Sequence, residues 1–309
     1  MAADTTTTPP EVPPLPAAVL TALTDAIPDP GRRSNTIAGG IPFSALEWGD
    51  PRGRPLVLIH GLGSSARNWW RVGPALATTG RRVIAPDQAG HGQTGHWVGH
   101  HAFRDNARDL AAWIRAAGLD VPEAQIVGHS WGGMTAAALP INMIMPATLV
   151  LLDPPSLPHQ LISSMVNDPS ERPNPDLAAN RDRLAAQNPD WSAEDVLAKA
   201  EGLTQADIEA ARSVLLENGD WDAGLADVSD PAADGIPTWL IRGDPMAGGL
   251  VPDAVLPDFA ARIGADHILT LAGAPHGPQR THPAATTAAL IRALASAGLA
   301  AGDANDYQL

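Results

Sequence analysis

The stretch QIVGHSWGG, residues 125–133, decides the fold. Its first five residues form a short apolar run of the kind found in buried parallel strands, and the sequence WGGMTAAAL from residue 131 predicts a helix. Between the two stands the pattern Gly-x-Ser-x-Gly. Small residues on both sides of Ser130 allow a tight, strained turn that pushes the serine hydroxyl out at the carboxyl edge of the sheet. The stretch therefore predicts Ser130 to be a nucleophile rather than part of a chance glycine–serine turn.

Similar short apolar runs lie on both sides of this stretch. A hairpin is predicted around residues 39–40, and further strands are predicted at residues 56–60, 82–86, 125–129, 148–153, 237–242 and 267–271. Helical patterns occur between them, at residues 66–78, 103–117, 131–144, 253–263 and 284–297. This alternation predicts an α/β fold with a mainly parallel, doubly wound sheet of about eight strands.

Three kinds of segment are expected along the chain. Residues 1–30 are rich in Thr and Pro, which predicts a flexible tail that is poorly ordered or packs loosely on the surface. Residues 31–153 and 236–309 carry the strands and form the expected core. Residues 154–235 contain Pro-rich turns and polar helical stretches but no convincing buried strand. Since a structureless segment of this length is implausible in a compact domain, we expect a helical cap inserted after the sixth strand.

The composition excludes several classes of function. The 309 residues include 20 Lys and Arg against 34 Asp and Glu, which gives a formal net charge of −14. This balance argues against nucleic acid or an anionic membrane as a partner, because both require a basic surface. The absence of cysteine removes disulfides, thiolate metal sites and cysteine nucleophiles. No secretory signal and no apolar run of bilayer length is apparent, so we expect a cytoplasmic protein.

A serine hydroxyl is a weak nucleophile unless a base lies within reach. In strand–turn–helix nucleophile motifs the base comes later in the chain. His276 lies in the sequence GAPHG, residues 273–277, directly after the last predicted strand. His267 opens that strand and His282 precedes the final helix, so both are better explained as structural or exposed residues. We therefore expect His276 to be the base.

Two aspartates compete for the role of the acid that orients the base. Asp153 ends the sixth predicted strand, and Asp244 follows the seventh. Both carboxylates would lie at the carboxyl edge of the sheet, where the histidine needs a partner. Each stands before a proline, so each also has a simpler explanation as a turn-forming residue.

The negative charge that develops on the substrate during attack needs backbone N–H donors. One is expected from Trp131, the residue after the serine. The second is expected from the loop HGLGSS, residues 60–65, whose glycines permit close backbone approach. Leu62 is the predicted donor in this loop.

The order of these motifs resembles that of the α/β-hydrolase superfamily from about residue 35 to residue 300. The motifs are HGLGSS, DQAGHGQT (residues 87–94), GHSWGG and GAPHG. Together they are specific for the fold and weak for the substrate. Common members of the superfamily place their acid three residues after the glycine that ends the seventh strand, and Met246 occupies that position here. Some relatives, including certain lactonases, place it directly after the sixth strand, so the resemblance favours Asp153 over Asp244.

These residues predict a serine hydrolase that cleaves a carboxylic ester or lactone through an acyl-enzyme, with no metal or organic cofactor. Hydrolysis of a carbon–carbon bond or an amide by the same triad stays open, as does a non-catalytic ligand-binding protein on the same fold. Epoxide hydrolase and dehalogenase chemistry is not expected, because it needs a carboxylate where Ser130 stands. Trp70 and Met165 are candidates for the substrate pocket. His96, His100 and His101 fit an exposed loop better than a metal site.

Overall fold

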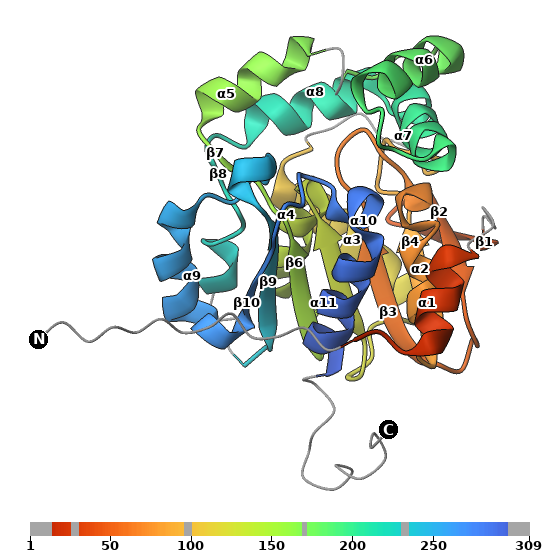
Figure 1. The fold of residues 1–309 in the computed structure, drawn as a ribbon, viewed down its shortest axis with the longest axis vertical. Helices are drawn as coiled ribbons and strands as arrows, with labels where there is room; N and C mark the ends of the chain where they lie inside the picture. Colours follow the sequence, from red (N-terminus) through yellow and green to blue (C-terminus); the bar gives the residue numbers. More distant parts are fainter. Residues whose placement is uncertain (1–13, 26–30, 96–100, 169–171, 230–234, 296–309) are drawn as a thin grey trace, which may run out of the picture.

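The computed structural model describes residues 14–25, 31–95, 101–168, 172–229 and 235–295 (Figure 1). Its centre is an eight-stranded sheet in the order β1-β2-β4-β3-β5-β6-β9-β10. Strands β1 and β2 form the predicted hairpin, β2 runs antiparallel to β4, and the other pairs are parallel. The predicted α/β fold with a mainly parallel sheet is thereby confirmed. The strands are β1 (Arg32–Ala38), β2 (Ile41–Trp48), β3 (Arg54–Ile59), β4 (Arg81–Pro86), β5 (Gln125–His129), β6 (Thr148–Leu152), β9 (Thr238–Gly243) and β10 (Ile268–Leu271).

The sheet is covered on both faces, which explains the uninterrupted apolar runs of its central strands. Alternate side chains of β3 enter different apolar clusters: Val57 and Ile59 lie on one face, and Leu56 and Leu58 on the other. Helices α3 (Phe103–Ala116), α4 (Trp131–Ala137) and α9 (Leu256–Ile263) supply residues to the first cluster. Helices α2 (Val72–Ala77) and α11 (Pro283–Ala295) supply residues to the second.

Three of the predicted helices are divided in the structure. Residues 66–78 form the 3₁₀ turn η1 (Ala66–Trp69) and α2, and residues 253–263 form η7 (Asp253–Val255) and α9. Helix α4 stops at residue 137 and is followed by η2 (Pro140–Asn142). A proline restricts the residue before it and lacks an N–H, so Pro140 prevents the α-helix from continuing to residue 144. Two further short elements, η8 (Ala265–His267) and α10 (Pro278–Thr281), flank β10.

The expected loose tail contains an ordered helix, α1 (Ala17–Thr24). Val19 and Leu23 are four residues apart and therefore lie on one face of this helix. Both are buried, in a cluster with Ala75 of α2. The prediction of a flexible or loosely packed segment is thus wrong for residues 17–24, because the Thr/Pro-rich composition hid a short apolar stripe. The parts of the tail at residues 1–13 and 26–30 lie outside the described residues.

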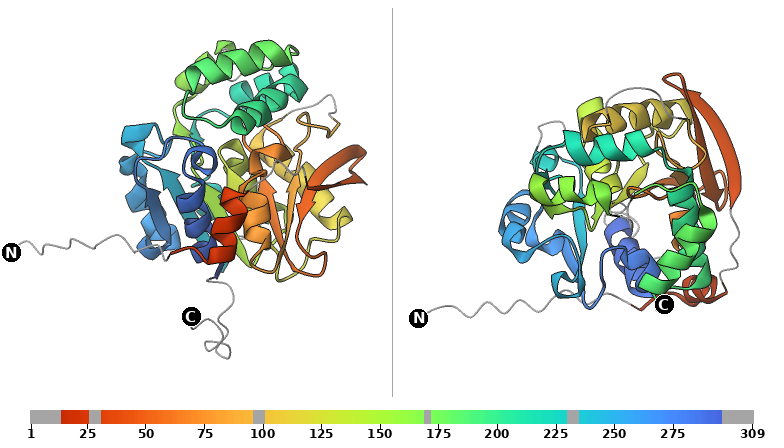
Figure 2. Two further views of the ribbon diagram at one scale, coloured as in Figure 1. Left: turned by 45° about the vertical axis from the view of Figure 1, so that its right-hand side comes forward. Right: turned by 90° about the horizontal axis from the view of Figure 1, so that it is seen from above.

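In the described residues that follow β6 and precede β9 in the sequence, four helices lie over the carboxyl end of the sheet, and we refer to them as the cap (Figures 1 and 2). They are α5 (His159–Ser164), α6 (Leu177–Gln187), α7 (Ala193–Gln205) and α8 (Ile208–Glu217). The turns η3 (Met165–Asn167) and η4 (Asp227–Ser229) also belong to this segment. A two-stranded antiparallel ribbon, β7 (Ser156–Leu157) with β8 (Trp221–Asp222), joins the two ends of the cap to each other.

Side-chain hydrogen bonds at their N-termini explain where three helices of the cap begin. The side chains of Asp176, Ser192 and Asp207 accept hydrogen bonds from backbone N–H groups in the first turns of α6, α7 and α8.

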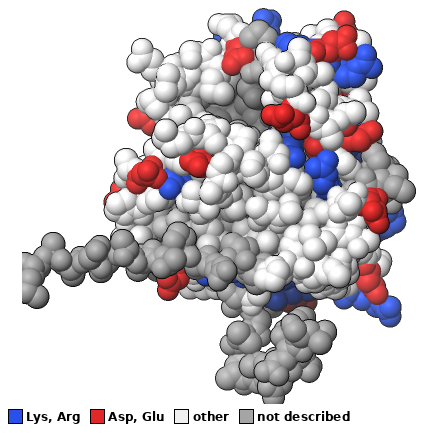
Figure 3. All heavy atoms as spheres, in the orientation of Figure 1, with Lys and Arg blue, Asp and Glu red and all other residues white. Residues whose placement is uncertain are grey.

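Acidic and basic side chains are scattered over the face shown in Figure 3, which is hollowed between the cap and the core. In the described parts of the chain, no helix has the length and apolar character needed to cross a bilayer.

Candidate active site

Ser130 occupies a sharp turn between β5 and α4. Its backbone has φ 56° and ψ −129°, a conformation that residues with a side chain rarely adopt. A side chain at Gly128 would overlap the carbonyl of Gly132, and one at Gly132 would overlap the carbonyl of His60. The two glycines of the motif therefore permit the close packing that holds the strained serine in place. The Ser130 hydroxyl consequently projects from the carboxyl end of β5, as the sequence predicts.

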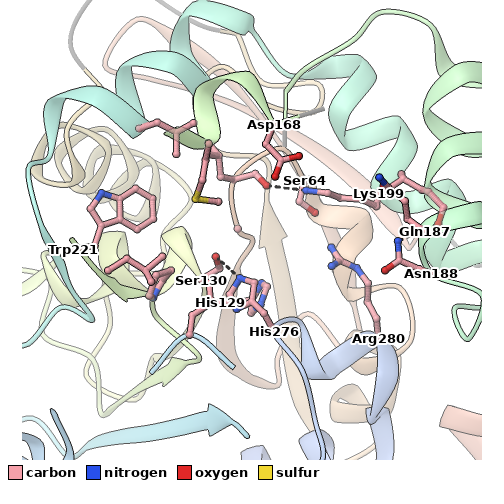
Figure 4. A pocket seen from close by; sticks show the side chains of 18 of the residues that line it. Ser64, His129, Ser130, Asp168, Gln187, Asn188, Lys199, Trp221, His276 and Arg280 are labelled. Carbon is pink, nitrogen blue, oxygen red and sulfur yellow. Dashed lines mark hydrogen bonds between the residues drawn. The ribbon is translucent and has the colours of Figure 1, made fainter. Parts of the chain in front are cut away.

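His276 connects the serine to a buried carboxylate. Its Nε2 lies 2.9 Å from Ser130 Oγ, and its Nδ1 lies 2.7 Å from Asp153 Oδ2. A carboxylate accepts only, so Nδ1–H donates to Asp153 and Nε2 is left to accept the serine proton. Figure 4 shows the bond between Ser130 and His276 at the floor of a pocket. The structure thus brings together the three residues that the sequence singled out.

Asp153 is fully buried and is held from several sides. Its Oδ1 accepts the Gly243 N–H at 2.9 Å, and its Oδ2 accepts the Leu250 N–H at 3.1 Å in addition to the bond from His276. Its own backbone has a positive φ of 43°. These contacts leave the carboxylate one orientation, which in turn fixes the plane of the imidazole ring.

Asp244, the alternative acid, has a structural role instead. Its carboxylate accepts the N–H groups of Met246 and Gly273, each at 2.9 Å. These hydrogen bonds, that of Gly273 first, hold the pKa of the Asp244 carboxyl below its ordinary value. Met246, at the position where common superfamily members carry their acid, is 94% exposed. The loop after β9 therefore directs no carboxylate to His276 in the described part of the chain.

The loop at residues 60–65 approaches the serine closely. A Cβ added at Gly61 would lie 2.9 Å from the Ser130 Cβ, which only a glycine avoids. Leu62 follows Gly61 and lines the pocket together with Ser130. On the other side, Trp131 begins α4, and N–H groups of a first helical turn have no partner inside the helix. The backbone N–H groups of Leu62 and Trp131 remain the predicted oxyanion donors.

His60 fixes this loop from behind and was not singled out from the sequence. The Gln88 N–H donates to His60 Nε2 at 3.0 Å, so the ring proton is on Nδ1, which donates to the Gly61 carbonyl at 2.8 Å. That carbonyl belongs to the peptide whose N–H is that of Leu62. Burial lowers the pKa of His60 to about 4, so the ring is neutral at pH 7. Its place between a buried strand and Gly61 was the only signal in the sequence.

His129, which precedes the serine, was also not singled out. Its ring stacks on that of His276 with centroids 5.0 Å apart, and its Nδ1 lies 3.3 Å from the Gln279 amide nitrogen. Burial holds the pKa of His129 well below its ordinary value, and the neighbouring His276 and Arg280 lower it further. A neutral His129 therefore supports the base without adding a second charge beside it.

Comparison with known proteins shows to which family the chain belongs. A sequence model of the alpha/beta hydrolase fold matches residues 54–220, more than half of the chain. The chain belongs to the α/β-hydrolase family. The superfamily expected from the four motifs is therefore confirmed.

Curated relatives of this α/β-hydrolase match over part of their length. One is a 2-hydroxymuconate semialdehyde hydrolase of Pseudomonas sp. (strain CF600), 40% identical over 118 residues, which are 37% of this chain and 40% of the relative. Another is epoxide hydrolase A of Mycobacterium tuberculosis (strain ATCC 25618 / H37Rv), 30% identical over 123 residues, 39% of this chain and 38% of the relative. The chain thus spans two fifths or less of the length of each.

Solved structures resemble this α/β-hydrolase over most of its length. A crystal structure of E-2-(acetamidomethylene)succinate hydrolase superposes with a TM-score of 0.70 and 22% identity, covering 85% of this chain and 98% of that one. A thermophilic esterase from Thermogutta terrifontis gives a TM-score of 0.66 with 20% identity, covering 86% of this chain and 99% of that one. At these identities the likeness establishes the fold alone.

A cavity of about 490 Å³ lies between the core and the cap of this α/β-hydrolase. Ser130 and His276 form part of its floor, and residues of α6, α7 and α8 contribute to its walls. Met165, one of the two residues predicted to line a pocket, does line this cavity. Its volume lies in the range of small-molecule sites.

Trp70, the other predicted pocket residue, faces elsewhere, so that prediction is wrong. The Trp70 side chain is buried where α7 meets the core, and its indole N–H donates to Asp195 at 2.9 Å. The Arg71 guanidinium lies over its ring, 4.5 Å from the centroid. A buried indole N–H needs an acceptor, and the carboxylate in the first turn of α7 supplies it. Trp70 therefore anchors the cap and does not contact the cavity.

Of the three histidines near residue 100, the structure describes His101, which is buried and therefore not part of the exposed loop that the sequence predicts. His96 and His100 lie outside the described residues, and the backbone N–H of His101 donates to Ser213. Within the described residues, no group of three or more His, Asp or Glu side chains could hold a metal ion.

Proposed function

We propose that this chain hydrolyses a carboxylic ester or lactone through an acyl-enzyme formed on Ser130. One observation carries the proposal: the continuous line of hydrogen bonds from Ser130 through His276 to Asp153, at the floor of a cavity covered by the cap. A nucleophile, its base and the orienting acid within hydrogen-bonding distance are the arrangement that acyl transfer requires.

In the first step His276 Nε2 accepts the Ser130 hydroxyl proton while Oγ attacks the substrate carbonyl carbon. The carbonyl oxygen becomes an oxyanion and is stabilised by the N–H groups of Leu62 and Trp131. Asp153 stabilises the imidazolium that results. His276 then donates its proton to the leaving alcohol oxygen as the carbon–oxygen bond breaks, which leaves the acyl group on Ser130.

In the second step a water molecule takes the place of the alcohol. His276 Nε2 accepts a proton from this water, and the hydroxide attacks the acyl carbonyl. The same two N–H groups stabilise the second oxyanion. When the intermediate collapses, His276 returns the proton to Ser130 Oγ and the carboxylic acid leaves. Both steps use only substrate, water and residues of this chain.

A carbon–carbon bond hydrolase is the second candidate. It is favoured by the similarity to the relative named 2-hydroxymuconate semialdehyde hydrolase, which is 40% identical over 118 residues. The same triad serves that chemistry and amide hydrolysis. The relative named an epoxide hydrolase does not favour epoxide opening here, because Ser130 stands where that reaction needs a carboxylate.

Steady-state hydrolysis of p-nitrophenyl esters of increasing acyl length tests the proposal. We expect release of p-nitrophenol by the wild-type chain and its loss, by about 10³-fold or more in kcat, in Ser130→Ala. Burst kinetics with a stoichiometric first turnover would support the acyl-enzyme. A wild-type chain that is inactive on every ester would contradict ester hydrolysis and favour the second candidate, and equal activity of Ser130→Ala would contradict the serine mechanism altogether.

A further inference from the structure

The two ends of the cavity differ in chemistry. Figure 4 shows Trp221 on one side of Ser130 and His276, whereas Lys199 and Arg280 lie on the other. The Trp221 side belongs to an apolar cluster in which residues of the cap meet Leu62. The cavity-lining residues of that cluster include Leu157, Met165, Leu215 and Trp221. At the opposite end, Figure 4 shows Gln187, Asn188, Lys199 and Arg280.

Lys199 is a buried cation at the polar end. It lies on α7, is 6% exposed, and its Nζ donates to the Leu62 carbonyl at 3.3 Å. A buried ammonium needs negative or strongly polar groups around it, and the Leu62 carbonyl is one of them. Because Lys199 also lines the cavity, a negatively charged ligand group there would meet an ammonium already positioned by the loop at residues 60–65.

Arg280 adds a second cation from the opposite wall. It lies on α10, four residues after His276, and its guanidinium is stacked over the Trp191 ring, 5.0 Å from the centroid. Both residues line the cavity. Stacking fixes the plane of a guanidinium, and a guanidinium held in a fixed plane suits recognition of a carboxylate. Asp168 also lines the cavity, so outside the triad the lining includes two cations and one carboxylate.

Ser64 provides an independent observation at the same end. Its side chain is 2% exposed, and its Oγ has no hydrogen-bond partner among the described residues. A side chain at Gly202 would lie 2.6 Å from the Ser64 Cα, so α7 packs directly on Ser64, one helical turn after Lys199. A buried hydroxyl without a partner is unfavourable, and a ligand oxygen in this part of the cavity would accept a hydrogen bond from it.

We propose that the substrate is an ester or lactone that carries a carboxylate, which Lys199 and Arg280 bind with the Ser64 hydroxyl. An apolar group of the same molecule occupies the Trp221 end, and the scissile carbonyl lies between them at Ser130. The turnover of such a substrate rests on the proposed function, whereas the binding of the carboxylate does not. The two are therefore tested separately.

The binding test uses the Ser130→Ala variant and two isosteric probes, 4-phenylbutyrate and 4-phenylbutanamide. We expect calorimetry to give at least about tenfold tighter binding of the carboxylate, because charge-assisted hydrogen bonds are roughly twice as strong as neutral ones. Adding Arg280→Gln or Lys199→Gln removes the preference, whereas Arg280→Lys retains part of it. Arg181→Gln is the matched control, since this arginine is exposed on α6 and does not line the cavity.

Equal affinity for the carboxylate and the amide would overturn the proposal, and so would a preference that survives the loss of both cations. If Lys199→Gln is unstable, Arg280→Gln alone decides the question, because the Arg280 side chain is partly exposed. Thermal unfolding with each probe then serves as the second readout: stabilisation by the carboxylate is expected in Ser130→Ala and not in the Arg280→Gln variant.

The turnover test uses wild-type chain and esters with the carboxylate on either side of the scissile bond. One pair is p-nitrophenyl hemiglutarate and p-nitrophenyl 5-oxohexanoate, and the other is 4-acetoxybenzoate and 4-acetoxybenzamide. A preference of about tenfold or more in kcat/KM for one charged ester supports the proposal and assigns the carboxylate to the acyl or alcohol part. Equal turnover within both pairs would overturn it while the proposed function stands. No turnover of any ester, with carboxylate binding retained, would contradict the proposed function and leave the carboxylate site supported.

Discussion

His276 Nδ1 lies 2.7 Å from Asp153 Oδ2, so the carboxylate that faces the base comes from the end of β6. The strand next to it, β9, contributes the Gly243 N–H that orients this carboxylate rather than an acid of its own. The contact explains why the loop after β9 needs no acid. Asp244 stabilises that loop through backbone N–H groups, and Met246 is exposed to solvent.

Two matched substitutions test this assignment. We expect Asp153→Asn to lower kcat/KM for an aryl ester by about 10³-fold or more, since the amide can hold the wrong imidazole tautomer. Asp244→Asn is expected to keep most of the activity, because Asp244 does not contact His276. Steady-state kinetics on both variants, with circular dichroism to verify folding, provide the measurement. An inactive but folded Asp244→Asn variant would show that the acid comes from β9.

The strained backbone at Ser130 predicts a stability effect opposite to the effect on activity. A residue with a side chain at this φ and ψ is disfavoured by about 1–3 kcal/mol relative to a glycine. We therefore expect Ser130→Gly to unfold at higher urea concentration than Ser130→Ala, with both variants inactive. The comparison with alanine removes the contribution of the hydroxyl. Equal unfolding free energies of the two variants would mean that the turn is not strained.

Acid sensitivity is predicted from the buried histidines of the loops around the serine. Burial lowers the pKa of His60 to about 4 and that of His91 to about 3, from an ordinary value of 6.5. As the pH falls below 6.5 the unfolded chain binds protons that these folded rings do not bind, so stability is lost on the way down to about pH 4 and pH 3. The shift at His60 corresponds to about 3 kcal/mol over that range.

Urea unfolding at pH 7, 6 and 5 measures this loss. His91→Phe is a useful partner variant, because the His91 ring is fully buried against Trp131 with centroids 4.9 Å apart. Because His91→Phe removes one titrating group, we expect the slope of the unfolding free energy against pH to be smaller by about 1.4 kcal/mol per pH unit below pH 6. If the unfolding free energies of wild type and His91→Phe changed in parallel with pH, the pKa of His91 would be the same in the folded and the unfolded chain.

Sequence patterns predict the sheet and the reacting residues because both depend on local signals. The strand, turn and helix around Ser130 place its hydroxyl, and the loop after the last strand brings His276 to it. The features that sequence patterns do not predict depend on contacts between segments far apart in the chain. The Trp70 indole donates to Asp195, 125 positions later in the chain. The residues around Trp70 do not indicate whether its ring contacts another part of the chain or a substrate. The same applies to His60, whose role appears only once Gln88 is beside it.

The contact of Asp195 with the core predicts how the cap is held in place. This carboxylate is 3% exposed, and it accepts hydrogen bonds from the Trp70 indole and from Arg71 at 2.9 and 3.0 Å. Asp195→Ala leaves both donors without this acceptor, and breaking a buried ion pair on one side destabilises by about 3 kcal/mol or more. We expect a lower thermal midpoint and faster proteolysis within the cap, measured together on one preparation. Asp182→Ala, which removes an exposed ion pair on α6, is expected to change the unfolding free energy by less than about 1 kcal/mol. If the two variants were equally stable, the contact between α7 and the core would not hold the cap.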